Sequence, residues 1–401
     1  MRLASLMIGE VKDLMDNLRA AIVGLGFMGG THIEALRRIG IDVIGCLGTF
    51  PQESQTGRQR FGLSRAYDNF DEMVNDRDVD VVHICVPNHL HHKMCLVALE
   101  AGKHVVCEKP LAVTHQEAAE LVEALGEKNL VGAVNYNLRY YPLCHEARKR
   151  IRLGEIGDVR LIHGQYLQDW LFYPTDWNWR LDPMLGGKMR AVADIGTHWF
   201  DMVTWLTGLR ITAVMADIST VIPTRYKPQQ AVETFASQLS ATDNTDQVEV
   251  QTEDYAAVLL QFDNGARGVV TISQVSAGHK NRFQWEIDGA RSSLGWQQEQ
   301  PNSLWVGHRD KSNEVLTKDP GLMHEDVRDI ASYPGGHAEG YPDTFKQLFK
   351  AVYKYIAEGN FNAPPTFPTF VDGYMEIVLC EAIQRSALEK RWVEINERTA
   401  V

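Results

Sequence analysis

Residues 19–32 read RAAIVGLGFMGGTH, an apolar run that leads into glycines spaced G-x-G-x-x-G and then into a helical pattern. Glycines at this spacing permit a tight turn, close approach of a ligand to the backbone, and close packing of helix on strand. The amino end of the following helix attracts negative charge, such as a pyrophosphate. The stretch therefore predicts the first unit of a dinucleotide-binding domain. The predicted cofactor-binding residues of this loop are Gly24, Gly26, Phe27, Met28 and Gly29.

Short apolar runs alternate with helical patterns downstream of this loop. Strands are predicted at 19–24, 41–47, 79–86, 103–108 and 130–134, and helices near 29–39, 53–61, 69–75, 90–101 and 115–128. Thr114 and Glu117 form a capping box for the last helix. Strands that are apolar on both faces, with helices between them, are typical of a parallel, doubly wound sheet. Residues 19–140 are therefore expected to form an α/β Rossmann domain.

The pattern changes after about residue 140. Two stretches, 255–275 and 283–296, each place a short Asn-Gly or Asp-Gly turn between runs of period 2, which is typical of antiparallel hairpins. Helical patterns at 196–207, 343–358 and 367–389 would cover one face of the sheet. Residues 141–401 are expected to form an α+β domain with a large, mostly antiparallel open sheet that binds substrate and supports oligomerisation. Residues 1–18 are expected to be an N-terminal extension.

Composition narrows the class of protein. A chain of 401 residues and 45.2 kDa is expected to fold as two domains. The net charge of −12 disfavours a nucleic-acid partner or an anionic membrane. The six cysteines show no CxxC spacing, and no run of about 18 apolar residues is present. A soluble cytoplasmic protein with reduced thiols is therefore expected.

The end of the second strand bears on the choice of cofactor. An acid is expected about 20 residues after the glycine loop to hold the adenosine ribose. The strand ends instead in Gly48 and Thr49, and the nearest acid is Glu53. Arginines that would hold a 2′-phosphate, Arg58 and Arg60, lie further along. NAD is therefore expected, with Thr49 among its contacts, and NADP stays an alternative.

Residues 86–92 read VPNHLHH and follow the third predicted strand. Three histidines within four positions suggest a metal site, but no matching Cys, Asp or Glu cluster completes one. We therefore expect no metal. Asn88 and His91 are instead predicted to lie at the edge of the cofactor.

Two further motifs carry candidate catalytic groups. VVCEKPL (105–111) ends a strand on Lys109 before Pro110, at the edge where parallel sheets bind ligands. DIGTHWFD (194–201) places Asp194 and His198 four residues apart, on one helical face. Taken alone, such a histidine is more often a hydrogen-bonded core residue than a catalytic one.

Together these motifs resemble the glucose–fructose oxidoreductase/inositol dehydrogenase (Gfo/Idh/MocA) family of nicotinamide-dependent oxidoreductases. The resemblance extends from about residue 19 to near the end of the chain. It rests on GLGFMGGTH (24–32), CVPNHLHH (85–92), AGKHVVCEKPLA (101–112), LGEIGDV (153–159), DIGTHWFD (194–201) and GHAEGYPDTF (336–345). The resemblance implies a catalytic group of Lys109, Asp194 and His198, with Glu108 and Lys109 also near the cofactor. It implies further that the Lys109–Pro110 bond is often cis, and that the open sheet is often buried against another subunit.

Two stretches depart from the family pattern and bear on the substrate. NYNLRYYP (135–142) places Asn135, Tyr136 and Arg139 after the fifth strand, and YLQDWLFYPTDWNWRLDP (166–183) is rich in tryptophan. Aromatic faces stack on sugar rings, so Trp177 and Arg180 are candidate substrate contacts, and Asp169, Asp176 and Asn178 are candidate partners for hydroxyls. An aromatic flap that only packs is an equal alternative.

These residues predict an NAD(P)-dependent dehydrogenase that acts on a ring hydroxyl of a sugar, glycoside or cyclitol. His198 would act as general acid/base, Lys109 would bond the reacting oxygen, and Asp194 would orient the site. A homodimer or homotetramer is expected. The alternatives are a hydrolase or epimerase that uses tightly bound NAD transiently, and a non-enzymatic sugar or nucleotide sensor.

Overall fold

The computed structural model describes residues 14–15, 17–126, 128–229 and 245–395, so most of the predicted N-terminal extension lies outside the described residues. The chain forms two compact units. Of the described residues, the first unit contains those up to Asn137 together with Pro342–Ile377, and the second contains those between Leu138 and Tyr341 together with residues 378–395. Each unit has a sheet of its own.

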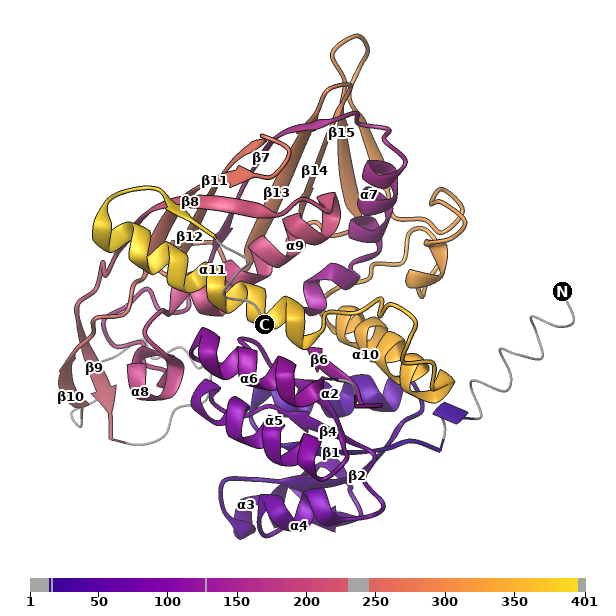
Figure 1. The fold of residues 1–401 in the computed structure, drawn as a ribbon, viewed down its shortest axis with the longest axis vertical. Coiled ribbons are helices and arrows are strands. Elements are labelled where there is room, and N and C mark those ends of the chain that lie inside the picture. The colour runs from indigo at the N-terminus through magenta and orange to yellow at the C-terminus, as the bar shows by residue number, and fades with distance from the viewer. Residues whose placement is uncertain (1–13, 16, 127, 230–244, 396–401) are drawn as a thin grey trace, which may run out of the picture. The chain divides into compact units, whose positions relative to one another are not determined.

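The first unit is built on a six-stranded parallel sheet in the order β3-β2-β1-β4-β5-β6 (Figure 1). Its strands are β1 (Arg19–Val23), β2 (Asp42–Leu47), β3 (Arg65–Ala66), β4 (Val81–Ile84), β5 (His104–Cys107) and β6 (Gly132–Val134). The predicted Rossmann fold is confirmed. The five predicted strands each begin within two residues of an observed strand. The edge strand β3 was not predicted, because two residues are too few to show a periodic pattern.

The helices of the first unit begin at local signals in the sequence. They are α2 (Phe27–Arg38), α3 (Pro51–Phe61), α4 (Phe70–Asn75), α5 (His91–Glu100) and α6 (His115–Leu125). The Thr114 side chain accepts a hydrogen bond from the backbone N–H of Glu117, so the predicted cap of α6 is confirmed. Asn69 caps α4 in the same way, through the N–H of Glu72.

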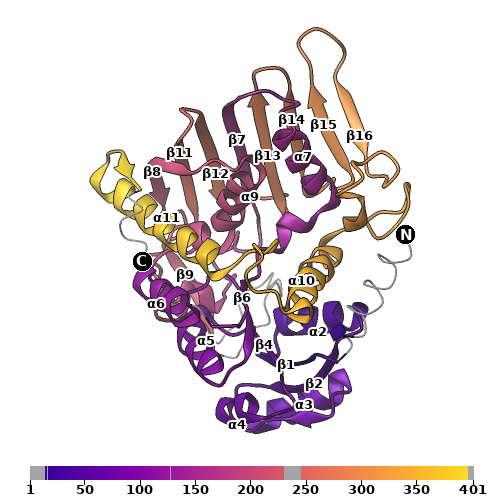
Figure 2. The same ribbon diagram turned by 45° about the vertical axis from the view of Figure 1, so that its right-hand side comes forward.

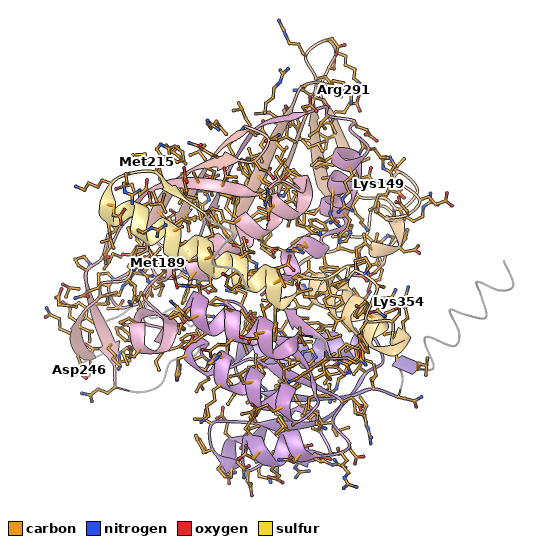
Figure 3. All side chains as sticks on the ribbon, in the orientation of Figure 1. Lys149, Met189, Met215, Asp246, Arg291 and Lys354 are labelled. Atoms are coloured by element: carbon orange, nitrogen blue, oxygen red, sulfur yellow. The ribbon has the colours of Figure 1, made fainter. Side chains whose placement is uncertain are left out.

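The helix α10 (Tyr341–Glu358) packs with the first unit, although the sequence predicts it as part of the second domain. Its buried face, which includes Phe345 and Phe349, lies against the imidazole rings of His32 and His83. Lys354 marks the exposed face (Figure 3). Sequence patterns show that such a helix is amphipathic but not which sheet it covers.

The long helix α11 (Phe370–Glu389) contributes residues to both units. Near its start, Gly373 packs closely against Leu111 and Val134 of the first unit. Further along, Leu379 and Ile383 belong to the core of the second unit. Among the described residues, no helix combines the length and the apolar character needed to cross a membrane.

The second unit is built on a nine-stranded sheet in the order β16-β15-β14-β13-β7-β12-β11-β8-β17. Its strands are β7 (Val159–Leu167), β8 (Ile211–Ser219), β11 (Tyr255–Phe262), β12 (Arg267–Ser273), β13 (Arg282–Gly289), β14 (Ser293–Gln297), β15 (Ser303–Gly307), β16 (Glu314–Thr317) and β17 (Val393–Glu394). Strands β7 and β12 pair in parallel, and the other neighbours pair antiparallel. Both predicted hairpins, β11–β12 and β13–β14, are confirmed.

Helices α7 (Pro142–Arg152) and α9 (Thr197–Thr207) cover one face of this sheet (Figure 2). Trp285, Phe283 and Ile162 point from the sheet into the core below them, and Trp199 and Phe200 point back from α9. A smaller sheet of β9 (Thr224–Pro228) and β10 (Thr245–Glu249) and the short helix α8 (Pro183–Gly186) belong to the same unit. The α+β architecture is confirmed.

The other face of the nine-stranded sheet carries an apolar row. Met215 on β8 pairs with Leu259 on β11, and Leu259 pairs with Val269 on β12. Their exposed fractions are 37%, 46% and 41%, and Met215 is labelled in Figure 3. Three half-exposed apolar side chains in cross-strand contact form a continuous apolar surface, which we call the outer row.

Candidate functional site

The glycine loop between β1 and α2 shows why each glycine stands where it does. Gly24 has a φ of +91°, and a Cβ built on it would lie 2.2 Å from the carbonyl oxygen of Cys85. A Cβ on Gly29 would lie 2.0 Å from the carbonyl oxygen of Gly24. At Gly26, by contrast, no described atom lies within 4 Å of such a Cβ. The chain itself requires the first and third glycines, and the middle one leaves open space in which a ligand can approach the backbone.

The start of α2 suits an anion. Gly26 precedes the helix without a side-chain cap, and its first turn, all of it described, carries no acidic residue. Phe27, the first helical residue, is 51% exposed. Backbone N–H groups at a helix start carry partial positive charge. The loop residues therefore fit the pyrophosphate of a dinucleotide.

The end of β2 is organised by hydrogen bonds to the backbone. The N–H of Thr49 donates to the Glu53 carboxylate at 2.6 Å, and the N–H of Gly48 donates to Oγ of Ser54 at 2.9 Å. Glu53 therefore fixes the turn into α3. The predicted contact of Thr49 with the cofactor stays a prediction.

The three clustered histidines have separate environments. His91 is buried, with Nδ1 2.7 Å from the carbonyl oxygen of Pro110 and Nε2 2.8 Å from that of Val86. Burial lowers the pKa of His91, against the opposing effect of these two hydrogen bonds. His92 lies 2.8 Å from the Glu120 carboxylate, and His89 is exposed. The ring of His91 therefore links the loops that follow β4 and β5.

A trio of possible metal ligands does exist among the described residues, at His163, Glu286 and Asp288 on β7 and β13. None of these is a predicted site residue.

Asn88, in the turn η1 (Asn88–Leu90), is buried, and its cofactor contact stays a prediction together with that of His91.

The EKP motif lies at the end of β5. The Lys109–Pro110 peptide bond is cis, as the resemblance implies, and Lys109 is half-buried. Glu108 is buried and accepts hydrogen bonds from Nε2 of His32 at 3.0 Å and from the Asn135 amide. Its other oxygen accepts the backbone N–H of Lys109 at 3.2 Å.

Glu108 is held as a carboxylate. Burial on its own raises the pKa of a carboxyl group, but the hydrogen bonds from His32 and the Asn135 amide and the charge of Lys109 outweigh it, so the pKa of Glu108 is lowered. A fixed negative charge therefore lies next to Lys109 in the sequence and in space.

In the second unit, Asp194 lies in a π-helical turn, η4 (Val192–Gly196), which runs directly into α9. The regular α-helical relationship predicted for Asp194 and His198 is therefore altered, because a π-turn contains an extra residue. His198 is buried, with its ring centroid 6.4 Å from that of Tyr166. Such turns occur frequently at functional sites.

Both carboxylate oxygens of Asp194 have partners. Nε of Arg180 donates to Oδ1 at 3.0 Å, and Nε2 of Gln274 donates to Oδ2 at 2.8 Å. The Arg180 guanidinium also lies over the ring of Trp179, 4.4 Å from its centroid. Arg180, predicted to contact substrate, is therefore an ion-pair partner of Asp194.

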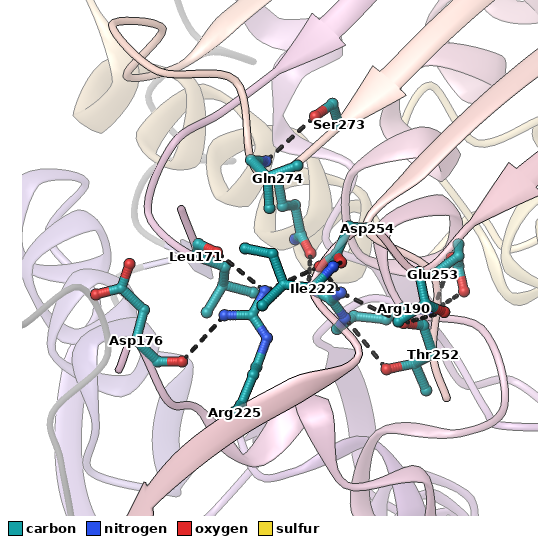
Figure 4. A network of polar contacts seen from close by, with 12 residues as sticks. Leu171, Asp176, Arg190, Ile222, Arg225, Thr252, Glu253, Asp254, Ser273 and Gln274 are labelled. Carbon is teal, nitrogen blue, oxygen red and sulfur yellow. Dashed lines mark hydrogen bonds and ion pairs between the residues drawn. The ribbon is translucent and has the colours of Figure 1, made fainter. Parts of the chain in front are cut away.

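Sequence reasoning did not identify Gln274 or the buried network behind it (Figure 4). Nη1 of Arg190 donates to Oε1 of Gln274 at 2.9 Å, which leaves the Gln274 amide nitrogen facing Asp194. Arg190 also pairs with Asp254, which accepts a second bond from Arg225 at 3.0 Å. These groups come from segments separated by 29 to 84 positions, so no local pattern signals them.

Glu253 stabilises the turn that carries Asp194. Its carboxylate accepts the backbone N–H groups of Arg190 and Val192, each at 2.9 Å. Burial raises the pKa of Glu253, against the effect of these hydrogen bonds. Hydrogen bonds therefore hold both the side chain of Asp194 and the backbone of the turn that carries it.

The remaining predicted substrate residues have internal partners. Nε of Arg139 donates to Oδ2 of Asp201 at 2.8 Å, and both side chains are buried. Tyr136 is fully buried, and Asn135 bonds Glu108. The substrate contacts predicted for these residues stay predictions.

The tryptophan-rich segment forms a small core of its own. Leu171, Leu181 and Val250 are buried there, and Trp170 and Trp177 pack against them. Asp176 accepts the backbone N–H of Tyr173, Asn178 caps a turn, and Asp169 pairs with Lys280. These contacts are internal to the protein, and the substrate contacts predicted for this segment stay predictions.

Comparison with known proteins matches both units to family models. Residues 18–136 match an oxidoreductase family with an NAD-binding Rossmann fold, and residues 144–295 match the GFO/IDH/MocA C-terminal domain. The chain belongs to the GFO/IDH/MocA family. This membership makes the chain an oxidoreductase with an NAD-binding Rossmann domain, in agreement with the open space at Gly26.

Two dehydrogenases are similar to this chain over nearly its whole length. A levoglucosan dehydrogenase from Pseudarthrobacter phenanthrenivorans is 31% identical over 399 residues, which cover 96% of this chain and 100% of that protein. A myo-inositol 2-dehydrogenase from Thermotoga maritima is 24% identical over 382 residues, covering 95% and 99%. Both are named as dehydrogenases of polyhydroxylated rings.

Solved structures of two similar proteins share the fold. A levoglucosan dehydrogenase in complex with NADH and L-sorbose superimposes with a TM-score of 0.84 at 30% identity, covering 94% of this chain and 99% of that one. An inositol dehydrogenase homologue from Azotobacter vinelandii, complexed with NAD+, gives a TM-score of 0.83 at 27% identity, covering 94% and 97%. The predicted fold class is therefore confirmed for both units.

Proposed function

We propose that this oxidoreductase transfers a hydride between NAD and a ring hydroxyl of a pyranose-type sugar, with anhydro-sugars of the levoglucosan type as the first candidates. The observation that carries the substrate class is the match to levoglucosan dehydrogenase along that protein's entire length. Levoglucosan is a rigid bicyclic pyranose whose free hydroxyls are all secondary ring hydroxyls. Reaction at such a hydroxyl needs a base for its proton and an acceptor for its hydride.

The cofactor supplies the hydride acceptor, and three side chains are proposed to handle the proton and the oxygen. His198 accepts the hydroxyl proton, and the Lys109 ammonium donates a hydrogen bond to the same oxygen as negative charge develops on it. Asp194 orients the site. Its carboxylate is suited to this role because Arg180 and Gln274 fix both of its oxygens.

The test is a screen of purified enzyme against levoglucosan, methyl glucosides, glucose and myo-inositol, each with NAD and with NADP. Formation of reduced cofactor in proportion to consumed sugar supports net dehydrogenation. A product formed without net reduction of cofactor would show instead that oxidation is transient. A clearly lower Kd for NADPH than for NADH would contradict the preference for NAD.

We also propose that the enzyme works as a cytoplasmic homodimer or homotetramer. The outer row of Met215, Leu259 and Val269 is apolar and half-exposed, which suits a surface covered by a second copy of the chain. The six cysteines are free thiols, which suits a reducing compartment.

A further inference from the structure

A continuous chain of buried polar side chains runs through the first unit and ends at Glu108. The Tyr353 hydroxyl lies 3.0 Å from Nε2 of His83, and Nδ1 of His83 lies 2.9 Å from Nδ1 of His32. Nε2 of His32 lies 3.0 Å from Oε1 of Glu108. The two histidines and Tyr353 have no exposed surface.

The surrounding rings hold both imidazoles in place. Phe349 of α10 contacts them edge-on, with ring centroids 4.7 Å from His32 and 4.9 Å from His83. The ring of Tyr353 stacks on His83 at 6.0 Å. Such packing leaves the rings little room to rotate, so the hydrogen-bond geometry is fixed.

The positions of the hydrogens follow from the two ends of the chain. At one end Glu108 is a carboxylate and accepts, so Nε2 of His32 carries a hydrogen. At the other end the Tyr353 hydroxyl donates to Nε2 of His83, because the described part of the chain offers that hydroxyl no other acceptor. Neutral His83 then carries its hydrogen on Nδ1 and donates to the bare Nδ1 of His32.

Two further observations agree with this direction. Burial holds the pKa of His83 well below its usual value, so His83 is neutral. Sγ of Cys85 lies 3.3 Å from Nδ1 of His32, and burial raises the pKa of this thiol, so its hydrogen also faces a bare nitrogen. In the opposite direction, the Tyr353 hydrogen would have no acceptor among the described residues.

We propose that Tyr353, His83 and His32 form an uncharged relay of hydrogen bonds in which every donor points toward Glu108, and that they act as positioning residues for the carboxylate beside Lys109. The relay stabilises a negative charge with aligned dipoles and adds no positive charge of its own. An imidazolium at His32 would instead neutralise Glu108 and compete with Lys109 for it.

The functional part of this inference rests on the proposed function. The catalytic lysine has to keep its ammonium group near a cofactor whose oxidised nicotinamide ring is also positive. A permanent carboxylate at Glu108 offsets that repulsion. The titratable groups that face Glu108 are His32 from α2, Cys85 after β4, His91 from α5, and Cys107 and Lys109 beside it.

The first test needs no substrate. In protein labelled with ¹⁵N-histidine, nitrogen–proton correlation spectra show which ring nitrogen carries hydrogen, and His32→Gln and His83→Gln variants assign the two signals. We expect His83 to be protonated on Nδ1 alone and His32 on Nε2 alone. A doubly protonated His32, or the opposite tautomer of either ring, would overturn the relay whatever the activity.

The second test uses the pH profile of kcat. His32→Leu removes the donor to Glu108, so the pKa of this carboxyl group rises and protonation removes the charge beside Lys109. We expect kcat to fall about 10-fold near pH 6 and to recover toward pH 9. His32→Gln keeps an N–H near the same place and should restore most of the activity.

His104→Asn is the matched control, because His104 is a partly buried histidine of the same unit outside the relay. Its Nδ1 accepts the backbone N–H of Val131, which an Asn oxygen can also do. Its pH profile should equal that of the unaltered protein. An unchanged profile in His32→Leu would refute the positioning role, whereas correct tautomers without any sugar oxidation would refute the proposed function alone.

Discussion

The amide nitrogen of Gln274 donates to Oδ2 of Asp194 at 2.8 Å, and the oxygen of the same amide accepts from Arg190 at 2.9 Å. Because an arginine can only donate, the amide cannot turn over without losing both bonds. Gln274 thus connects the buried Arg190–Asp254 pair to Asp194 and fixes the orientation of the Asp194 carboxylate.

Replacing this amide should affect turnover more than cofactor binding. In Gln274→Leu, Asp194 loses one of its donors and Arg190 loses an acceptor, so we expect kcat to fall roughly 10- to 100-fold. The Kd for NADH, measured by fluorescence titration, should stay within about twofold because Gln274 belongs to the second unit. Gln165→Leu, on the strand β7 that pairs with β12, is the control and should leave kcat unchanged. Equal losses in both variants would contradict the assigned role.

The glycine loop allows stability to be separated from cofactor binding. Gly26→Ala adds a methyl group where no described atom lies within 4 Å, so its melting temperature should not change while NADH affinity drops about 10-fold or more. Gly24→Ala meets a carbonyl oxygen at 2.2 Å and requires a φ of +91°. It should therefore lose about 2 kcal/mol or more of unfolding free energy. Normal NADH binding by Gly26→Ala would refute the site.

Lys109→Ala tests the catalytic assignment. The side chain is half-buried at the end of β5, so its loss should change the unfolding free energy by less than about 1 kcal/mol. Turnover should fall roughly 100-fold, since the developing negative charge loses its donor. The measurement is kcat on the sugar found by screening, with NADH affinity as the control. Near-normal kcat would exclude Lys109 from the reaction.

Buried histidines should make the protein sensitive to acid. Burial lowers the pKa of His104 to about 4 and that of His145 to about 3, in the latter case with help from the charges of Arg148 and Arg139. In the unfolded chain these histidines take up protons as the pH falls through about 6.5, whereas in the folded chain they stay neutral. The free energy of unfolding therefore has its full value above that pH and decreases below it. Each such histidine contributes a slope of about 1.4 kcal/mol per pH unit.

The check is the unfolding free energy from urea titrations between about pH 7 and 5. His145 lies between the rings of Tyr140 and Trp205, at centroid distances of 5.3 and 4.9 Å, so His145→Phe fits the same space. This variant should show a shallower pH slope than the unaltered protein. An identical slope would mean that His145 does not stay neutral.

The outer row predicts the effect of a charge on assembly. Leu259 lies between Met215 and Val269, so Leu259→Lys places an ammonium group in the middle of the apolar row. We expect the mass measured by light scattering to fall to that of a single chain. Lys227→Glu, at an exposed position of β9, is a charge control that should leave the mass unchanged. A single-chain mass for the unaltered protein would refute the oligomer.

The sequence predicts most of the Rossmann unit because its strands are apolar throughout and its helices begin at recognisable caps. Thr114 marks the start of α6, and the three glycines mark the first turn. The hairpins of the second unit follow equally well from their Asn-Gly and Asp-Gly turns. The edge strand β3 has only two residues and too little pattern to detect.

The partners of the site residues could not be predicted in the same way. Arg180 pairs with Asp194, and His91 bonds two backbone carbonyls, because tertiary folding brings these groups together. Gln274, Arg190 and Asp254 belong to three separate segments, and His83 meets Tyr353 across 270 positions. Residue type and local spacing contain no information about such long-range neighbours.

The return of α10 to the first unit has a consequence for biosynthesis. A ribosome that has released the first 140 residues has supplied every Rossmann strand but not the helix that covers His32 and His83. The nascent domain therefore stays incomplete until the segment through Glu358 leaves the ribosome, some 200 residues later. Until then the apolar surface that α10 covers is exposed. Throughout that interval the unfinished surface is available to chaperones, and a fragment truncated near residue 140 would keep it permanently exposed.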